Sequence, residues 1–177
     1  MVEHVIERLT IHHTGVPLED NKEAPARVLA HQVFHQVDRD WPDLAYHFVI
    51  DRAGNLYEGR SLEFRGDTAT SYDPTGHFLV VLEGNFDEEP TADLQLRSLT
   101  QLLAWASDHY SVGLDTIESH RDYAPGETSC PGDNLYPLIE SGELVRDVRS
   151  IMKDELIELV YLRGEEALER VEEIESA

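Results

Sequence analysis

The chain has 177 residues, of which 41% are apolar, a length that suits one globular domain with a sizeable core rather than two large ones. Its 36 acidic and 14 basic residues give a formal net charge of −22. Such a charge would repel nucleic acid and anionic lipid, so nucleic acid is not an expected partner. The single cysteine, Cys130, excludes an internal disulfide.

Four strands are expected in the first half of the chain. Residues 5–14 alternate in hydrophobicity, which indicates a strand. Residues 45–60, "AYHFVIDRAGNLYEGR", indicate a β-hairpin, because β-branched and aromatic residues flank a Gly-Asn turn. Residues 77–85, "HFLVVLEGN", are nearly all apolar, which is typical of a strand buried on both faces of a sheet. The polar segment "FRGDTATSYDPTG", residues 64–76, is rich in turn formers and is expected to be a loop.

Two long helices are predicted between and after these strands. The first runs from Pro25 to about residue 38, because apolar residues recur there at helical spacing. Its apolar face, which is expected to pack on a sheet, comprises Val28, Leu29, Val33, Phe34 and Val37. The second covers residues 91–110, with Thr91 as its cap. Its stripe comprises Leu94, Leu99, Leu102, Leu103 and Ala106. Residues 115–122, "DTIESHRD", are expected to start as a short strand that leads into the loop around Cys130.

The character of the chain changes after Ser141, where charged and apolar residues alternate at helical spacing. We expect two helical segments, one with a stripe through Leu144, Val148, Ile151 and Leu159, the other after Gly164 with Leu168, Val171 and Ile174. The interleaved elements predict the α/β class, with a central mixed β-sheet flanked by helices and a C-terminal helical extension. We divide the chain into a domain of residues 1–142 and an extension of residues 143–177, which would cover the domain or mediate self-association.

Cys130, in "ETSCPGD", is open to three interpretations: a small buried hydrophobe, a nucleophile with a histidine partner, or a metal ligand. Among the nine histidines, His31 and His35 have metal-ligand spacing on one helix face, although the polar edge of an amphipathic helix has the same pattern. His12 and His120 differ, since they lie with Cys130 at predicted strand ends or loops that a sheet can direct to one point. Two imidazoles and a thiolate with one open position would form a catalytic zinc site.

Three segments carry a family resemblance. "LTIHHT", "AYHFVIDRAGNLYEGR" and "ESHRDYAPGETSCPGD" occur in this order, and together they resemble the zinc-dependent type-2 N-acetylmuramoyl-L-alanine amidases, which include the peptidoglycan recognition proteins and the phage lysozyme-type amidases. The resemblance covers roughly residues 5–140. It implies that Zn²⁺ is bound by His12, His120 and Cys130.

The resemblance also implies an activity, the hydrolysis of the amide between N-acetylmuramic acid and L-alanine of the stem peptide. Tyr46 would orient the attacking water or carry its proton, and Thr128 would donate a hydrogen bond to the oxyanion. At the position of Thr128 some active members have lysine and others threonine. The candidates for gripping the peptide or sugar, with a solvated loop as the alternative, are Arg65, Asp67, Thr68 and Asn85. Arg60 and Asp122 are expected to order the site through hydrogen bonds.

Other functions remain open at this stage. A recognition module would bind peptidoglycan without cutting it, as relatives that lose a zinc ligand do; the presence of all three ligands and Tyr46 favours the enzyme. A cysteine amidase with Cys130 and His120 is the competing chemistry, disfavoured by Pro131 and by the lack of a thiol-protease motif. The enzyme could also act on another amide.

Peptidoglycan or a muropeptide is the expected partner. We expect no membrane span, because no apolar run approaches the ~18 residues that one needs, and no signal peptide, because the N-terminal segment "MVEHVIERLT" carries charges throughout. Localisation is left open, since the implied substrate lies outside the cytoplasm.

Overall fold

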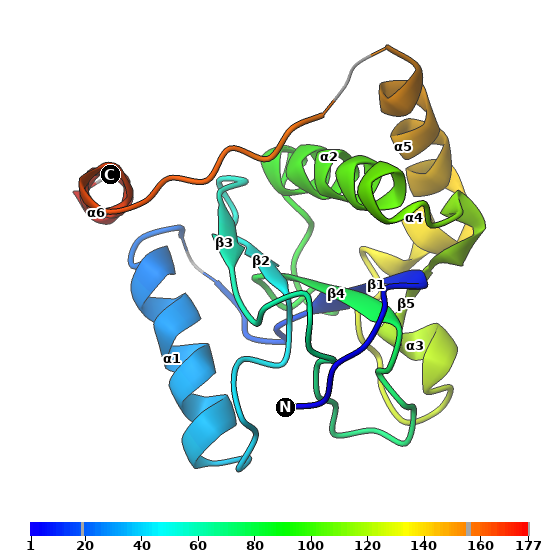
Figure 1. Ribbon diagram of the computed structural model, residues 1–177, viewed down its shortest axis with the longest axis horizontal. Helices are drawn as coiled ribbons and strands as arrows, with labels where there is room; N and C mark the ends of the chain where they lie inside the picture. Colours follow the sequence, from blue (N-terminus) through cyan, green and yellow to red (C-terminus); the bar gives the residue numbers. More distant parts are fainter. Residues whose placement is uncertain (19, 155–156, 177) are drawn as a thin grey trace.

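The computed structural model describes residues 1–18, 20–154 and 157–176. One five-stranded sheet has the order β3-β2-β4-β1-β5 (Figure 1). The strands are β1 Arg8–His13, β2 Phe48–Ile50, β3 Leu56–Glu58, β4 His77–Leu82 and β5 Ile117–Ser119. Four of them run parallel and β3 pairs antiparallel with β2, so the sheet is mixed and the predicted α/β class is confirmed.

Helices cover both faces of this sheet (Figure 1). The described helices are α1 Ala24–Val37, α2 Asp93–Tyr110, α3 His120–Tyr123, α4 Tyr136–Glu140, α5 Glu143–Asp154 and α6 Glu165–Ser176, with a 3₁₀ turn at Leu114–Thr116. The larger core lies between the sheet and α2, where Leu9, Phe78 and Val80 meet Leu99 and Leu102. A smaller cluster on the opposite face joins Leu44, Val49 and Val81 to Val28 of α1.

Strand β4 lies at the centre of the sheet, as its sequence predicts. All six of its residues are buried, and it pairs in parallel with β1 on one side and β2 on the other. A strand covered on both faces has no solvent side to select polar residues, and this is why its sequence lacks alternation.

The predicted burial of the apolar face of α1 is confirmed for Val28, which packs on the smaller cluster, and is wrong for the other four residues. Leu29 and Val37 expose 60% and 74% of their surface, and Val33 and Phe34 are exposed as well. The helix instead buries Ala24 and His35. The Nδ1 atom of His35 accepts a hydrogen bond from the Ala45 N–H at 3.2 Å, and the ring contacts Trp41, so this polar residue fixes the helix against the domain.

Three smaller expectations also fail: the Thr91 cap, the burial of Leu94 and the helical position of Leu159. Helix α2 starts after Ala92 rather than at a Thr91 cap, and the Ala92 N–H is accepted by the side-chain oxygen of Gln95 at 3.2 Å. Gln95 is buried and Leu94 is 54% exposed, because the Gln95 amide also donates to the Glu83 carbonyl at 2.8 Å. Leu159 lies in a segment without helix between α5 and α6, not on a helical stripe.

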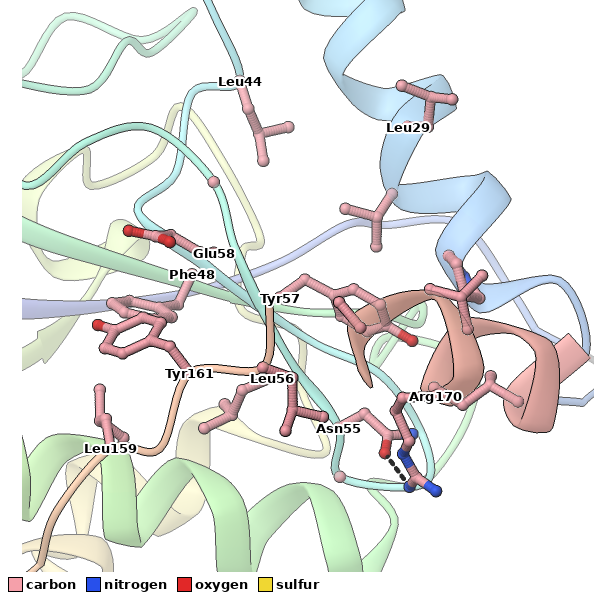
Figure 2. Close-up of a pocket in the computed structure, with 18 of the residues that line it drawn as sticks. Leu29, Leu44, Phe48, Asn55, Leu56, Tyr57, Glu58, Leu159, Tyr161 and Arg170 are labelled. Carbon is pink, nitrogen blue, oxygen red and sulfur yellow. Dashed lines mark hydrogen bonds between the residues drawn. The ribbon is translucent and has the colours of Figure 1, made fainter. Parts of the chain in front are cut away.

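The C-terminal extension contacts the rest of the chain through α5, through Ile157 and Leu159, which pack against the larger core, and through α6. Leu144 and Val148 of α5 are buried in the larger core beside α2. Helix α6 lies beside α1, and there Arg170 donates a hydrogen bond to the Asn55 side chain at 2.6 Å (Figures 1 and 2). A cavity of about 640 Å³ separates the extension from α1 and β3 (Figure 2). The division at residue 142 stays a prediction. No described helix is long and apolar enough to cross a membrane.

The pH dependence of folding should report a buried neutral histidine. His47 is fully buried; its Nδ1 accepts from the Leu79 N–H at 2.9 Å and its Nε2 donates to the Phe64 carbonyl at 3.0 Å. Burial lowers the pKa of His47 from 6.5 to about 4. Between pH 6.5 and 4 the unfolded chain therefore binds a proton at His47 that the folded chain does not bind. The free energy of unfolding falls over this range by about 1.4 kcal/mol per pKa unit of the shift.

Denaturant unfolding at a series of pH values measures this loss. His47→Gln should flatten the dependence by the contribution of one proton. Equal slopes for the wild type and His47→Gln would contradict the assignment.

Candidate metal centre

The parallel pairing of β1 with β5 brings two histidines together. Ile11 lies opposite Ser119 in this pairing, so the next residues, His12 within β1 and His120 directly after β5, lie side by side at the same end of the sheet. His12 is the fifth residue of β1 and is 2% exposed; His120 starts α3 directly after β5. Their ring centroids are 4.6 Å apart.

Cys130 reaches the same point from the loop that follows α3. Its Sγ accepts a hydrogen bond from the His13 main-chain N–H at 3.3 Å and lies 3.7 Å from Nδ1 of His12. The loop is held on either side of the thiol, because the Arg121 N–H donates to the Cys130 carbonyl at 2.9 Å and the Thr128 hydroxyl accepts the Cys130 N–H at 3.1 Å. Hydrogen bonds to the Cys130 main chain, together with the His13 N–H, therefore place the sulfur.

These three residues form a metal-type cluster. Their ligand atoms lie within 4.8 Å of one another, and no other group of His, Cys, Asp or Glu among the described residues meets that condition. Burial lowers the pKa of His12 and also that of His120, the latter to about 4, so both imidazoles are neutral and keep a lone pair. Burial raises the pKa of the Cys130 thiol to about 12, opposed by the hydrogen bond from His13. A bound cation would favour the thiolate, and two imidazoles with one thiolate suit zinc with an open fourth position.

The two residues predicted to act beside the metal both lie at the cluster. The ring of Tyr46 lies 5.1 Å from that of His12, and burial raises the pKa of its hydroxyl. Thr128 is half-buried, two residues before Cys130. Because its oxygen accepts the Cys130 N–H, its hydroxyl proton is free to donate elsewhere.

The loop of residues 61–76 contributes residues that the sequence did not single out. The Thr70 hydroxyl is 2.7 Å from Nε2 of His120, and the Tyr72 hydroxyl is 3.5 Å from Nε2 of His12. Thr68, one of the predicted substrate contacts, lies 3.4 Å from the same atom of His120. A polar loop without periodicity gives no signal for such contacts, since only the fold brings it over the histidines.

The other predicted substrate contacts have mainly structural partners. The carboxylate of Asp67 accepts from Arg60 at 2.7 Å. Arg65 pairs with Asp73 at 3.1 Å, away from the three-residue cluster. Asn85 follows β4, where its side chain accepts the Asp87 N–H at 3.2 Å. Substrate contact by these residues stays a prediction.

Arg60 is the main organiser of this loop. It is 1% exposed and donates to the carbonyls of Asp43, Leu44 and Arg65 as well as to Asp67. Asp122 has a similar local task, since it accepts from the N–H and hydroxyl of Ser119, the residue before His120.

Three further histidines are satisfied by other contacts. Nδ1 of His35 is already occupied by the Ala45 N–H, so a metal site with His31 is not favoured. His13 and His47 use ring nitrogens on main-chain partners: Nδ1 of His13 accepts from the Phe86 N–H at 3.2 Å, and His47 joins Leu79 to Phe64.

Comparison with known proteins decides the family. The family model of N-acetylmuramoyl-L-alanine amidases, Amidase_2, matches residues 3–133. The chain belongs to this family. Mouse peptidoglycan recognition protein 1 is 32% identical over 149 residues, which cover 81% of this chain and 79% of the relative.

Two further relatives are an amidase and a peptidoglycan recognition protein. The human N-acetylmuramoyl-L-alanine amidase is 30% identical over 140 residues, 75% of this chain, but the match spans only 23% of that longer protein. The crystal structure of Drosophila peptidoglycan recognition protein SD superposes with a TM-score of 0.71 at 26% identity, covering 79% of this chain and 83% of the other. This chain therefore resembles both proteins named as amidases and proteins named as recognition proteins.

Replacement of Arg60 should remove hydrogen bonds that hold the loop of residues 61–76 in place. Arg60→Lys keeps the charge, but an ammonium group lacks the planar, forked donors with which the guanidinium contacts four acceptors. Buried carbonyls therefore lose their donor. We expect the free energy of unfolding to fall by about 2–4 kcal/mol. Arg65→Lys, in an exposed ion pair, should change it by no more than about 0.5 kcal/mol. Urea unfolding of both variants measures the difference, and equal stabilities would refute the role of Arg60.

Proposed function

We propose that this chain is a zinc-dependent amidase that hydrolyses the bond between N-acetylmuramic acid and L-alanine of the peptidoglycan stem peptide. The observation that carries the proposal is the convergence of His12, His120 and Cys130 into a three-ligand set. A structural zinc site would close with a fourth protein ligand, whereas three ligands leave a position for chemistry. The family match and the name of the human relative supply the bond.

The chemistry would divide between the metal and two side chains. Zinc, when bound by these residues, supplies the Lewis acidity that activates water and polarises the scissile carbonyl. The ring of Tyr46 lies 5.1 Å from that of His12, so its hydroxyl would donate a hydrogen bond that orients the water and would relay its proton. The free hydroxyl proton of Thr128 is available to the oxygen that becomes negative during attack.

Cys130 is poorly suited to be a nucleophile. It is 6% exposed, and its sulfur is turned towards His12 and the His13 N–H. A nucleophilic thiol needs access to the substrate and a partner that favours the thiolate, as at exposed electropositive sites. The arrangement favours the ligand role over a cysteine amidase.

A recognition module is the second candidate, and a specific observation favours it. The mouse recognition protein shares 32% identity over most of both chains, so the fold here is compatible with binding alone. The two candidates differ in outcome: a recognition module would retain muropeptide without releasing the peptide. Peptidoglycan is the proposed ligand in both cases.

Zinc content measured together with peptide release tests the proposal. The wild type should hold one zinc per chain by elemental analysis and release the L-alanine peptide from a muropeptide. Cys130→Ser should lose both zinc and release. Zinc without release would favour the recognition module or another amide, and release without zinc would revive the cysteine nucleophile.

Tyr46→Phe should separate metal binding from catalysis. The variant loses one hydroxyl next to His12 but no ligand atom, so it should keep one zinc per chain. Removal of a positioned proton donor should lower kcat about 10²–10⁴-fold. Steady-state release of the L-alanine peptide measures this effect, with Tyr57→Phe, whose hydroxyl bonds Asp51 at 2.9 Å away from the cluster, as the matched control. Unchanged kcat in Tyr46→Phe would remove Tyr46 from the mechanism.

A further inference from the structure

The outer nitrogens of both histidines in the cluster face hydroxyls of one loop. Nε2 of His120 lies 2.7 Å from the Thr70 hydroxyl, and Nε2 of His12 lies 3.5 Å from the Tyr72 hydroxyl. Thr70 and Tyr72 come from residues 61–76, remote in sequence from both histidines. One short segment thus contacts both members of the imidazole pair.

The orientation of each ring follows from these contacts. An imidazole that binds a metal through one nitrogen carries its proton on the other, and the partner of that second nitrogen fixes the tautomer. Nδ1 of His12 faces Cys130 at 3.7 Å, so its Nε2 is the outer nitrogen. Since Thr70 occupies Nε2 of His120, Nδ1 is the nitrogen left for a metal.

We propose that Thr70 is a positioning residue that holds His120 in the tautomer with a proton on Nε2, and that Tyr72 supports His12 in the same way through a longer contact. The inference rests on the zinc site of the proposed function. In that tautomer His120 donates to the Thr70 oxygen, which leaves the Thr70 hydroxyl proton for the Thr68 oxygen at 2.8 Å. Each oxygen in this chain receives a donor, so the direction of the hydrogen bonds is consistent.

The loop is anchored on both sides of Thr70, as a positioning residue requires. The N–H of Ser71 donates to the Glu127 carboxylate at 2.9 Å, and the Ser71 hydroxyl bonds the same group. Glu127 lies three residues before Cys130, so this contact joins the loop to the segment that supplies the thiol. On the other side, Asp67 is held by the buried Arg60 at 2.7 Å. Thr70 therefore keeps its place without support from a substrate.

Loss of such a partner lowers metal affinity. Partners of ligating histidines typically contribute 10–100-fold to metal binding. Thr70→Val is nearly isosteric and removes only the hydroxyl, so we expect zinc to bind roughly 10–100-fold more weakly. Thr70→Ser restores the hydroxyl and should return the affinity to nearly that of the wild type.

Competition against a chromophoric zinc chelator tests the inference on the full chain. The matched control is Thr75→Val in the same loop, whose hydroxyl bonds Asp73 at 2.8 Å and should leave the affinity unchanged. Tyr72→Phe should weaken zinc binding less than Thr70→Val, because its contact is longer. Equal affinity of Thr70→Val and the wild type would overturn the proposal.

A second measurement keeps the test independent of how well the variants fold. Nitrogen-15 NMR of the zinc-loaded wild type should show the His120 proton on Nε2 and the metal on Nδ1, and the reverse tautomer would overturn the inference. A wild type that binds no zinc would refute the proposed function itself. The failure of the metal site is thereby distinguished from the failure of the role of Thr70.

Discussion

The parallel register of β1 and β5 is the constraint on which the site depends. With Ile11 opposite Ser119, His12 and His120 must emerge side by side, whatever the intervening chain does. A shift of the pairing by one residue would turn one of these side chains to the other face of the sheet. Strand β1 is fixed in turn by β4, whose six buried residues pair with it along its whole length. Core packing therefore sets the geometry of the histidines.

The third member of the cluster is positioned by a different means. Cys130 lies on a loop, and its sulfur is located by the His13 N–H, next to His12 in the chain. The same strand thus supplies one imidazole and the main-chain donor that directs the thiol. The loop of residues 61–76 adds Thr70 and Tyr72 over the outer side, anchored by Arg60 and Glu127. A rigid strand therefore provides His12, and hydrogen-bonded loops provide Cys130, Thr70 and Tyr72.

Much of this arrangement could be predicted from sequence, because burial patterns and family motifs are local. The hairpin and the buried strand, predicted over residues 77–85 and found at His77–Leu82, follow from periodicity. The mixed sheet follows from the interleaving of strands and helices, and the family assignment follows from three motifs. The outward face of α1 was missed, since a regular stripe through Leu29 and Val37 does not reveal that His35 makes the deciding contact. Thr70 was missed because its role depends on a loop fold that hydrogen bonds to distant residues determine. Roles in catalysis and substrate binding stay predictions.

X-ray absorption at the zinc edge tests the central claim most directly, since it reports the atoms around the metal independently of activity. For two imidazoles and one thiolate we expect one sulfur at about 2.3 Å and nitrogen or oxygen neighbours at about 2.0–2.1 Å. Because Cys130 is the only cysteine of the chain, a thiolate sulfur at that distance is assigned to this residue without a variant. A first shell without sulfur in the zinc-loaded wild type would contradict the assignment of His12, His120 and Cys130 as the metal site.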